Sequence, residues 1–289
     1  MKGKGILSLG LKTVLSILLC VGLMQCASAQ NSAKGSLFII GGGNRSDALI
    51  KQLVSTAGLG SKDYIIVLPM ASEQPDTGFK YISQQLKRET NATIRNFDFN
   101  HHSTQDKKWT DSVAGAKLIY ILGGDQNHFM KAVLGTPVYT AIHEAYQKGA
   151  TIAGTSAGAA VMSRYMITGK QLQEQKYKET FDRLWHHNIE FAEGLGLLKQ
   201  TIIDQHFLKR SRYNRLISAL ADKPDYICVG IDEGTAIIVK GDRATVAGES
   251  QVLRFALPQK AVKASDQLIS FKTLEMGIFT AGDVIRIKP

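Results

Sequence analysis

The sequence predicts an α/β fold in which helices cover both faces of a mostly parallel sheet. Short apolar, β-branched segments alternate with longer amphipathic segments from residue 36 to residue 153, which is the pattern of repeated β-α-β units. The apolar segments end in glycine or polar residues, as strands do when their carboxyl ends carry a ligand site. No linker or repeat divides the roughly 260 residues that follow the N-terminal segment, so one three-layer domain is expected.

Each element of this sheet can be assigned in chain order. The expected strands are Ser36–Ile40, Tyr64–Leu68, Thr93–Phe97, Lys117–Leu122 and Thr151–Ala153. The helical spacing of apolar residues predicts the covering helices Asp47–Ala57, Thr77–Glu89, Gln126–Leu134 and Pro137–Lys148. Beyond these, residues 165–193 are polar and predict a loop or lid, and residues 201–207 predict a strand that leads into a helix over 208–216. Short strands of alternating polarity over 226–287 predict a β-rich C-terminal extension.

The first 29 residues have the layout of a secretory signal peptide. Three lysines precede the apolar segment Thr13–Met24, and Ala27-Ser28-Ala29 supplies small residues for cleavage. The apolar segment is short for a membrane span. We therefore expect a signal peptide over 1–29, a mature domain over 30–289, and a secreted or periplasmic protein. A lipoprotein anchored at Cys26 is less favoured because the bulky Gln25 precedes that cysteine.

Composition excludes several classes of function. The net charge of +10 becomes +7 without the three signal lysines, a balance that favours anionic partners. Nucleic acid is not an expected partner, since basic and aromatic residues are not interleaved. Cys228 would be the only cysteine of the mature chain, which rules out an intramolecular disulfide and a cysteine metal cluster.

The segment Gly154-Thr155-Ser156-Ala157-Gly158 matches the G-x-S-x-G pattern of a nucleophile elbow. In that turn a strained backbone between a strand and a helix exposes the serine hydroxyl. The alternative is a tight turn without a catalytic role, in which the small residues are required only for steric reasons. The elbow predicts a serine nucleophile.

A serine nucleophile needs a base, and histidine is the usual one. Of the seven histidines, His128 and His206 each follow a strand end. His206 is favoured because Asp204 and Gln205 precede it and an arginine-rich segment follows. The glycines at 41–43 do not complete G-x-G-x-x-G, because Ser46 stands at the third glycine position, so a nucleotide site is disfavoured.

Together these motifs resemble the cyanophycinases and the related dipeptidase E-like serine peptidases, which share a fold with class I glutamine amidotransferases. The motifs that carry the resemblance occur in family order: Gly41-Gly42-Gly43, Gly123-Gly124-Asp125-Gln126, the elbow at 154–159, Asp204-Gln205-His206-Phe207 with its arginines, and Gly230-Ile231-Asp232-Glu233.

The resemblance implies Ser156 as nucleophile and His206 as general base, with the amides of Gly124 and Ala157 as the oxyanion hole. It also implies an acid between the elbow and the histidine, which points to Glu174, with Asp182 as the rival. No cofactor or metal is required for this acyl transfer.

The substrate that the resemblance implies is cyanophycin, an aspartate polymer with arginine on each β-carboxyl, cleaved to β-aspartyl-arginine dipeptides. Arg210, Arg212 and Arg215 suit its carboxylates, and because of their spacing on a helix only two of them are expected to reach the site. Gln126, Gln205, Asp204 and Glu233 are expected to contact the substrate, Gln126, Asp204 and Glu233 by receiving amide or guanidinium groups.

Two alternatives remain open from sequence. One is a dipeptidase for aspartyl or isoaspartyl peptides with the same nucleophile and base; the other is a periplasmic binding protein that keeps the fold without catalysis. The oligomeric state is also open, with a homodimer as one option.

Overall fold

The computed structural model describes residues 33–173, 178, 182–259, 262–263 and 268–289. Residues 33–289 form one compact unit. The expected signal peptide and Glu174 lie outside the described residues. No helix in the described part of the chain is long and apolar enough to cross a membrane.

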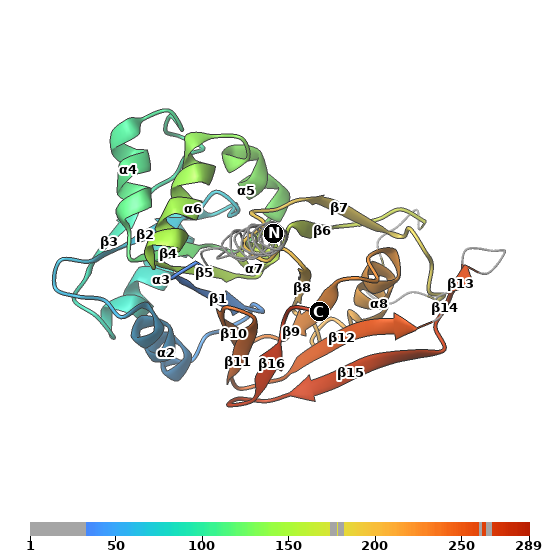
Figure 1. Ribbon diagram of the computed structural model, residues 1–289. Helices are drawn as coiled ribbons and strands as arrows, with labels where there is room; N and C mark the ends of the chain where they lie inside the picture. The colour runs from blue at the N-terminus through green and yellow to red at the C-terminus, as the bar shows by residue number, and fades with distance from the viewer. Residues whose placement is uncertain (1–32, 174–177, 179–181, 260–261, 264–267) are drawn as a thin grey trace, which may run out of the picture. The chain divides into compact units, whose positions relative to one another are not determined.

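The larger of two main sheets has eight strands in the order β16-β11-β10-β1-β5-β4-β2-β3 (Figure 1). Five of these are parallel to one another and run along the first half of the chain: β1 Ser36–Ile40, β2 Tyr64–Leu68, β3 Thr93–Asn96, β4 Leu118–Ile121 and β5 Thr151–Thr155. The antiparallel strands β10 Thr235–Lys240, β11 Arg243–Gly248 and β16 Val284–Arg286 extend the sheet beyond β1. The predicted α/β fold and its parallel strands are confirmed.

Helices cover both faces of this sheet (Figure 1). On one face α2 Asp47–Ala57 and α3 Pro75–Lys87 pack through Leu53 and Leu86 against buried strand residues such as Phe38. The other face is covered by α4 Lys107–Gly115, α5 Gln126–Val133, α6 Pro137–Lys148 and the short α7 Ala157–Ala160. Amphipathic spacing predicted α2 and α6 with the observed bounds, whereas α4 was not predicted.

The second main sheet has four strands in the order β15-β12-β9-β8. It contains β8 Thr201–Gln205, β9 Ile227–Ile231, β12 Val252–Gln259 and β15 Thr273–Phe279, with α8 Tyr213–Asp222 packed against it. The predicted single C-terminal extension is therefore divided between two sheets. Within this second sheet β8 and β9 are parallel neighbours, and Gln205 at the end of β8 pairs with Ile231 at the end of β9.

Two smaller pairs complete the fold, and one of them corrects the prediction of a strand-poor lid. The antiparallel strands β6 Tyr165–Gln171 and β7 Ile189–Glu193 form a hairpin from the ends of that segment. The side chains of this hairpin alternate too weakly in polarity to predict strands, yet Met166 and Ile167 in β6 are buried. The other pair joins β13 Val262–Lys263 to β14 Ile269–Ser270.

Candidate active site

The candidate site is built on three successive carbonyl groups at the end of β1. Ile40 O accepts a hydrogen bond from the Ser156 amide at 3.0 Å, and Gly41 O accepts one from the His206 amide at 2.7 Å. Gly42 O accepts a third, at 3.0 Å, from Gly234. The end of one strand thus fixes three loops that are far apart in sequence, those after β5, β8 and β9.

Ser156 lies at the turn between β5 and α7. Its backbone has φ 52° and ψ −110°, a conformation that side chains rarely adopt. Its hydroxyl Oγ lies 2.8 Å from His206 Nε2. The strained turn predicted from G-x-S-x-G is therefore present, and it directs the serine toward the histidine.

On the other side of the imidazole ring, His206 Nδ1 lies 2.7 Å from Glu233 Oε1. Glu233 follows β9 and His206 follows β8, so the parallel pairing of these strands brings both residues to the carboxyl ends of two adjacent strands. Serine, imidazole and carboxylate form one hydrogen-bonded chain, an arrangement in which the carboxylate orients the ring and the ring can accept the serine proton.

Glu233 was expected to contact the substrate, and this expectation requires correction because its carboxylate faces the histidine. The expected acid, Glu174, lies outside the described residues. Its rival, Asp182, is exposed and pairs with Lys178 at 2.9 Å. The sequence signal for Glu233 was only its place after the apolar segment that ends at Ile231.

The glycines at 41–43 allow this close packing. A Cβ atom at Gly42 would lie 2.3 Å from His206 Cε1, and one at Gly43 would lie 2.7 Å from the Glu233 Cβ. Both residues also have positive φ, 118° and 69°. The loop that could suggest a nucleotide site is instead the surface against which the histidine and the glutamate pack.

Burial is the main influence on the pKa of His206, and it lowers that pKa below the ordinary value because it disfavours the charged ring. The hydrogen bond from Glu233 opposes the shift, while the positive charges of Arg210 and Arg212 lower the pKa further. The imidazole is therefore neutral at neutral pH, the state in which it can accept a proton.

The hydroxyl of Ser156 opens into a cavity of about 410 Å³. Most of the predicted site residues line it, together with one glycine from β6 that sequence reasoning missed: Gly124, Gln126, Ser156, Gly169, Gln205, His206, Arg210, Arg212 and Arg215. The amides of Gly124 and Ala157 donate no hydrogen bond to other backbone groups in the described ranges. Gly124 lines the cavity, whereas Ala157 is fully buried and does not line it, so their role as an oxyanion hole stays a prediction.

All three arginines line the cavity, where only two were expected. The predicted helix over 208–216 begins only at Tyr213, so Arg210 and Arg212 belong to the preceding turns, in which Ser211 has φ 48°. The spacing of a continuous helix therefore does not apply to them. The cavity is rich in guanidinium groups, which suits a substrate that carries carboxylates.

Asp204 does not line the cavity, contrary to the expectation that it contacts substrate. Its side chain is fully buried, and both of its carboxylate oxygens bind Arg215, one of them at 2.9 Å from Nε. Arg212 Nη1 lies 3.6 Å from the same carboxylate and donates to Gln205 O at 2.7 Å. Asp204 therefore holds the arginines in place from behind.

Gln126 lines the cavity but also supports its wall. Its side-chain amide donates to Ile167 O and Thr168 O of β6, both at 2.9 Å. Because both amide hydrogens are used, its carbonyl oxygen is the group that remains for a substrate donor.

Other histidines have structural positions. His186, expected in a solvated loop, is buried 3.6 Å from Asp222, and His143, expected on a helix surface, bonds Leu195 O at 2.8 Å. His128 is exposed. Within the described ranges no group of three or more His, Cys, Asp or Glu side chains is placed to hold a metal ion.

Comparison with known proteins agrees with this geometry. The model of peptidase family S51 matches residues 37–247. This chain belongs to peptidase family S51. It is a serine-type peptidase, as the earlier resemblance implied.

Among S51 relatives, a cyanophycinase from Nostoc sp. is 34% identical over 73% of this chain and 70% of its own length. The cyanophycinase of Geminocystis herdmanii is 32% identical over 76% of this chain and 79% of its own length. A peptidase E from Pasteurella multocida is 28% identical over 52% of this chain and 62% of its own. The solved structure of a peptidase from an acI-B1 Actinobacterium shares the fold, with a TM-score of 0.61 at 22% identity, over 89% of this chain and 99% of that one.

Proposed function

We propose that this S51 peptidase is exported and hydrolyses cyanophycin to β-aspartyl-arginine dipeptides, with Ser156, His206 and Glu233 as its catalytic residues. The observation that carries the proposal is the hydrogen-bonded chain of these three side chains at the edge of a cavity lined by three arginines. The similarity to proteins named cyanophycinases supports the substrate, and the lysines and apolar segment of residues 1–29 support export.

The reaction follows from the geometry of the three residues. As Ser156 Oγ attacks the scissile carbonyl carbon, its proton passes to His206 Nε2, 2.8 Å away. Glu233 holds the ring in position and stabilises the imidazolium that forms. The amides of Gly124 and Ala157 stabilise the oxyanion.

Collapse of this intermediate breaks the peptide bond, and the imidazolium returns the proton to the leaving amine. The acyl group stays on Ser156 as an ester. Water, activated in turn by His206, then hydrolyses the ester and restores the serine.

The substrate suits the charges of the cavity. Each cyanophycin unit carries the free carboxylate of its arginine, and the guanidinium groups of Arg210, Arg212 and Arg215 provide donors of matching geometry. Asp204 pairs with Arg212 and Arg215 and so neutralises part of this charge.

The proposal is tested by incubating the mature chain from Gln30 with insoluble cyanophycin and measuring released dipeptide by mass spectrometry. Ser156→Ala removes only the hydroxyl and should reduce release by at least about 10⁴-fold, because nucleophile, base and acid act as a unit. Circular dichroism of the variant should match that of the unsubstituted protein.

Turnover by Ser156→Ala would overturn the assignment of the nucleophile. Cleavage of aspartyl or isoaspartyl dipeptides without cleavage of the polymer would retain the catalytic residues and replace the substrate.

A further inference from the structure

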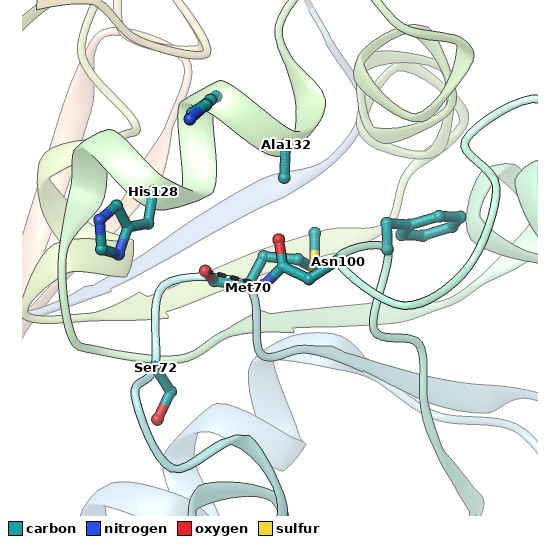
Figure 2. A pocket seen from close by; sticks show the side chains of 7 residues that line it. Met70, Ser72, Asn100, His128 and Ala132 are labelled. Carbon is teal, nitrogen blue, oxygen red and sulfur yellow. Dashed lines mark hydrogen bonds between the residues drawn. The ribbon is translucent and has the colours of Figure 1, made fainter.

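A second hollow, of about 430 Å³, lies between α5 and the loops that follow β2 and β3 (Figure 2). His128 and Ala132 of α5 face Met70 and Asn100 across it. Its lining residues are Met70, Ser72, Phe99, Asn100, His128, Lys131 and Ala132. None of them belongs to the catalytic residues or to the arginine-lined cavity.

The Gly123–Gly124 turn lies close both to Ser156 and to Ser72, which lines the hollow. A Cβ atom at Gly123 would lie 3.2 Å from the Ser156 Cβ. A Cβ atom at Gly124 would lie 2.9 Å from the Cα of Ser72, and the Asp125 amide donates to Ala71 O at 2.8 Å. The turn that carries one expected oxyanion amide therefore contacts residues of both hollows.

This position has a consequence for a bound polymer. When the scissile carbonyl oxygen lies against the Gly124 amide, the chain leaves the scissile bond in two directions. For the units on the two sides of the bond, the neighbouring surfaces are then the arginine-lined cavity and the hollow that contains Ser72.

The lining of the hollow suits a carboxylate that lies beside an aliphatic chain, as the carboxylate of an arginine does. Met70 and Phe99 are buried and give it an apolar floor. Lys131 is exposed at the rim and has no ion pair with any residue in the described ranges. An ammonium on an open rim can bind a carboxylate in a charge-assisted hydrogen bond.

The remaining polar groups of the rim are consistent with this. Ser72 Oγ accepts from the Gln74 amide at 3.1 Å and keeps its own hydrogen to donate. The side-chain amide of Asn100 donates one of its two hydrogens to Met70 O, with Nδ2 3.4 Å from that oxygen. Among the described residues no acid lines the hollow, and the neighbouring Asp125 lies 3.8 Å from His128.

We propose that this hollow is a second substrate subsite, in which Lys131 binds a carboxylate of the polymer unit across the scissile bond from the arginine-lined cavity. The proposal rests on the proposed function, and it predicts that the enzyme recognises units on both sides of the bond that it cleaves. Lys131 is a specificity-determining residue in this account.

The test compares three oligomers of three β-aspartyl-arginine units. One is unmodified, one carries a carboxamide in place of the arginine carboxylate at its first unit, and one carries it at its last. Values of kcat/KM are measured for the unsubstituted protein, for Lys131→Met and for Lys51→Met. Lys51 lies on the exposed face of α2, so its substitution removes the same charge away from the hollow.

The expected result is that one carboxamide lowers kcat/KM about tenfold in the unsubstituted protein and in Lys51→Met, as loss of a hydrogen bond to a charged group does. The same carboxamide should have no effect in Lys131→Met, whose kcat/KM for the unmodified oligomer is already about tenfold lower. A penalty that is equal in Lys131→Met and the unsubstituted protein would overturn the subsite alone. If no oligomer is cleaved by the unsubstituted protein, the proposed function is overturned, and the subsite with it.

Discussion

The carboxylate of Glu233 opposes the effect of burial on the charge of His206. Its hydrogen bond to Nδ1 raises the pKa of His206 against the larger effect of burial, which lowers it. Since a base must be neutral to accept a proton, activity is lost as the pH falls through this pKa. The acid limb of the pH profile should therefore lie below about 6.5, the ordinary value for histidine.

Glu233→Gln removes the charge and keeps the size of the side chain. We expect kcat to fall by about 10²–10⁴-fold, because the amide no longer stabilises the imidazolium. The acid limb should move to still lower pH, because an influence that raises the pKa of His206 is lost. The measurement is the pH dependence of kcat/KM.

Glu249→Gln is the matched control, since it removes the same charge from an exposed position beside Gly234 and not from His206. Its profile should be that of the unsubstituted protein. An unchanged kcat in Glu233→Gln would show that another acid serves His206.

At the scale of elements, the end of β8 and the start of α8 are joined by a buried ion pair. Asp204 and Arg215 are both almost fully buried, and the pair also fixes the arginines of the cavity. Removing one partner of such a pair leaves an uncompensated buried charge, which is costly.

Asp204→Asn should therefore lower the free energy of unfolding by about 3–5 kcal/mol, measured by urea denaturation. Asp47→Asn provides the comparison, because Asp47 forms an exposed pair with Arg88 and its loss should cost no more than about 1 kcal/mol. Equal losses in the two variants would contradict a structural role for Asp204.

The elements also show where sequence patterns are informative. Strong periodicity of the apolar residues and clear end signals predicted α2, α6 and the parallel strands. The two helices end at Gly58 and Gly149, which have left-handed conformations. The prediction of a helix over 208–216 was wrong at its start. The residues there are compatible with a helix, but the backbone turns sharply at Ser211, and all three arginines line one cavity. Tertiary contacts there override local preference.

For the whole molecule, the candidate site depends on the order of strands, which sequence alone did not fix. Ser156 and His206 were predicted because each follows a strand and has a side chain that can act as a nucleophile or as a general base. The role of Glu233 was not predicted, because it requires knowing that β8 and β9 are parallel neighbours. Asp204 was misassigned for a related reason: only packing reveals that its side chain is fully buried against Arg215 and does not line the cavity.

The central claim is that Ser156 is a nucleophile activated by His206 and held within one chain of hydrogen bonds. It is tested most directly by treating the mature chain with a fluorophosphonate and locating the adduct by peptide mass spectrometry. We predict one adduct, on Ser156, that is absent in Ser156→Ala and forms far more slowly in His206→Ala. An adduct on any other residue, or equally fast labelling of Ser156 without the histidine, would contradict the account.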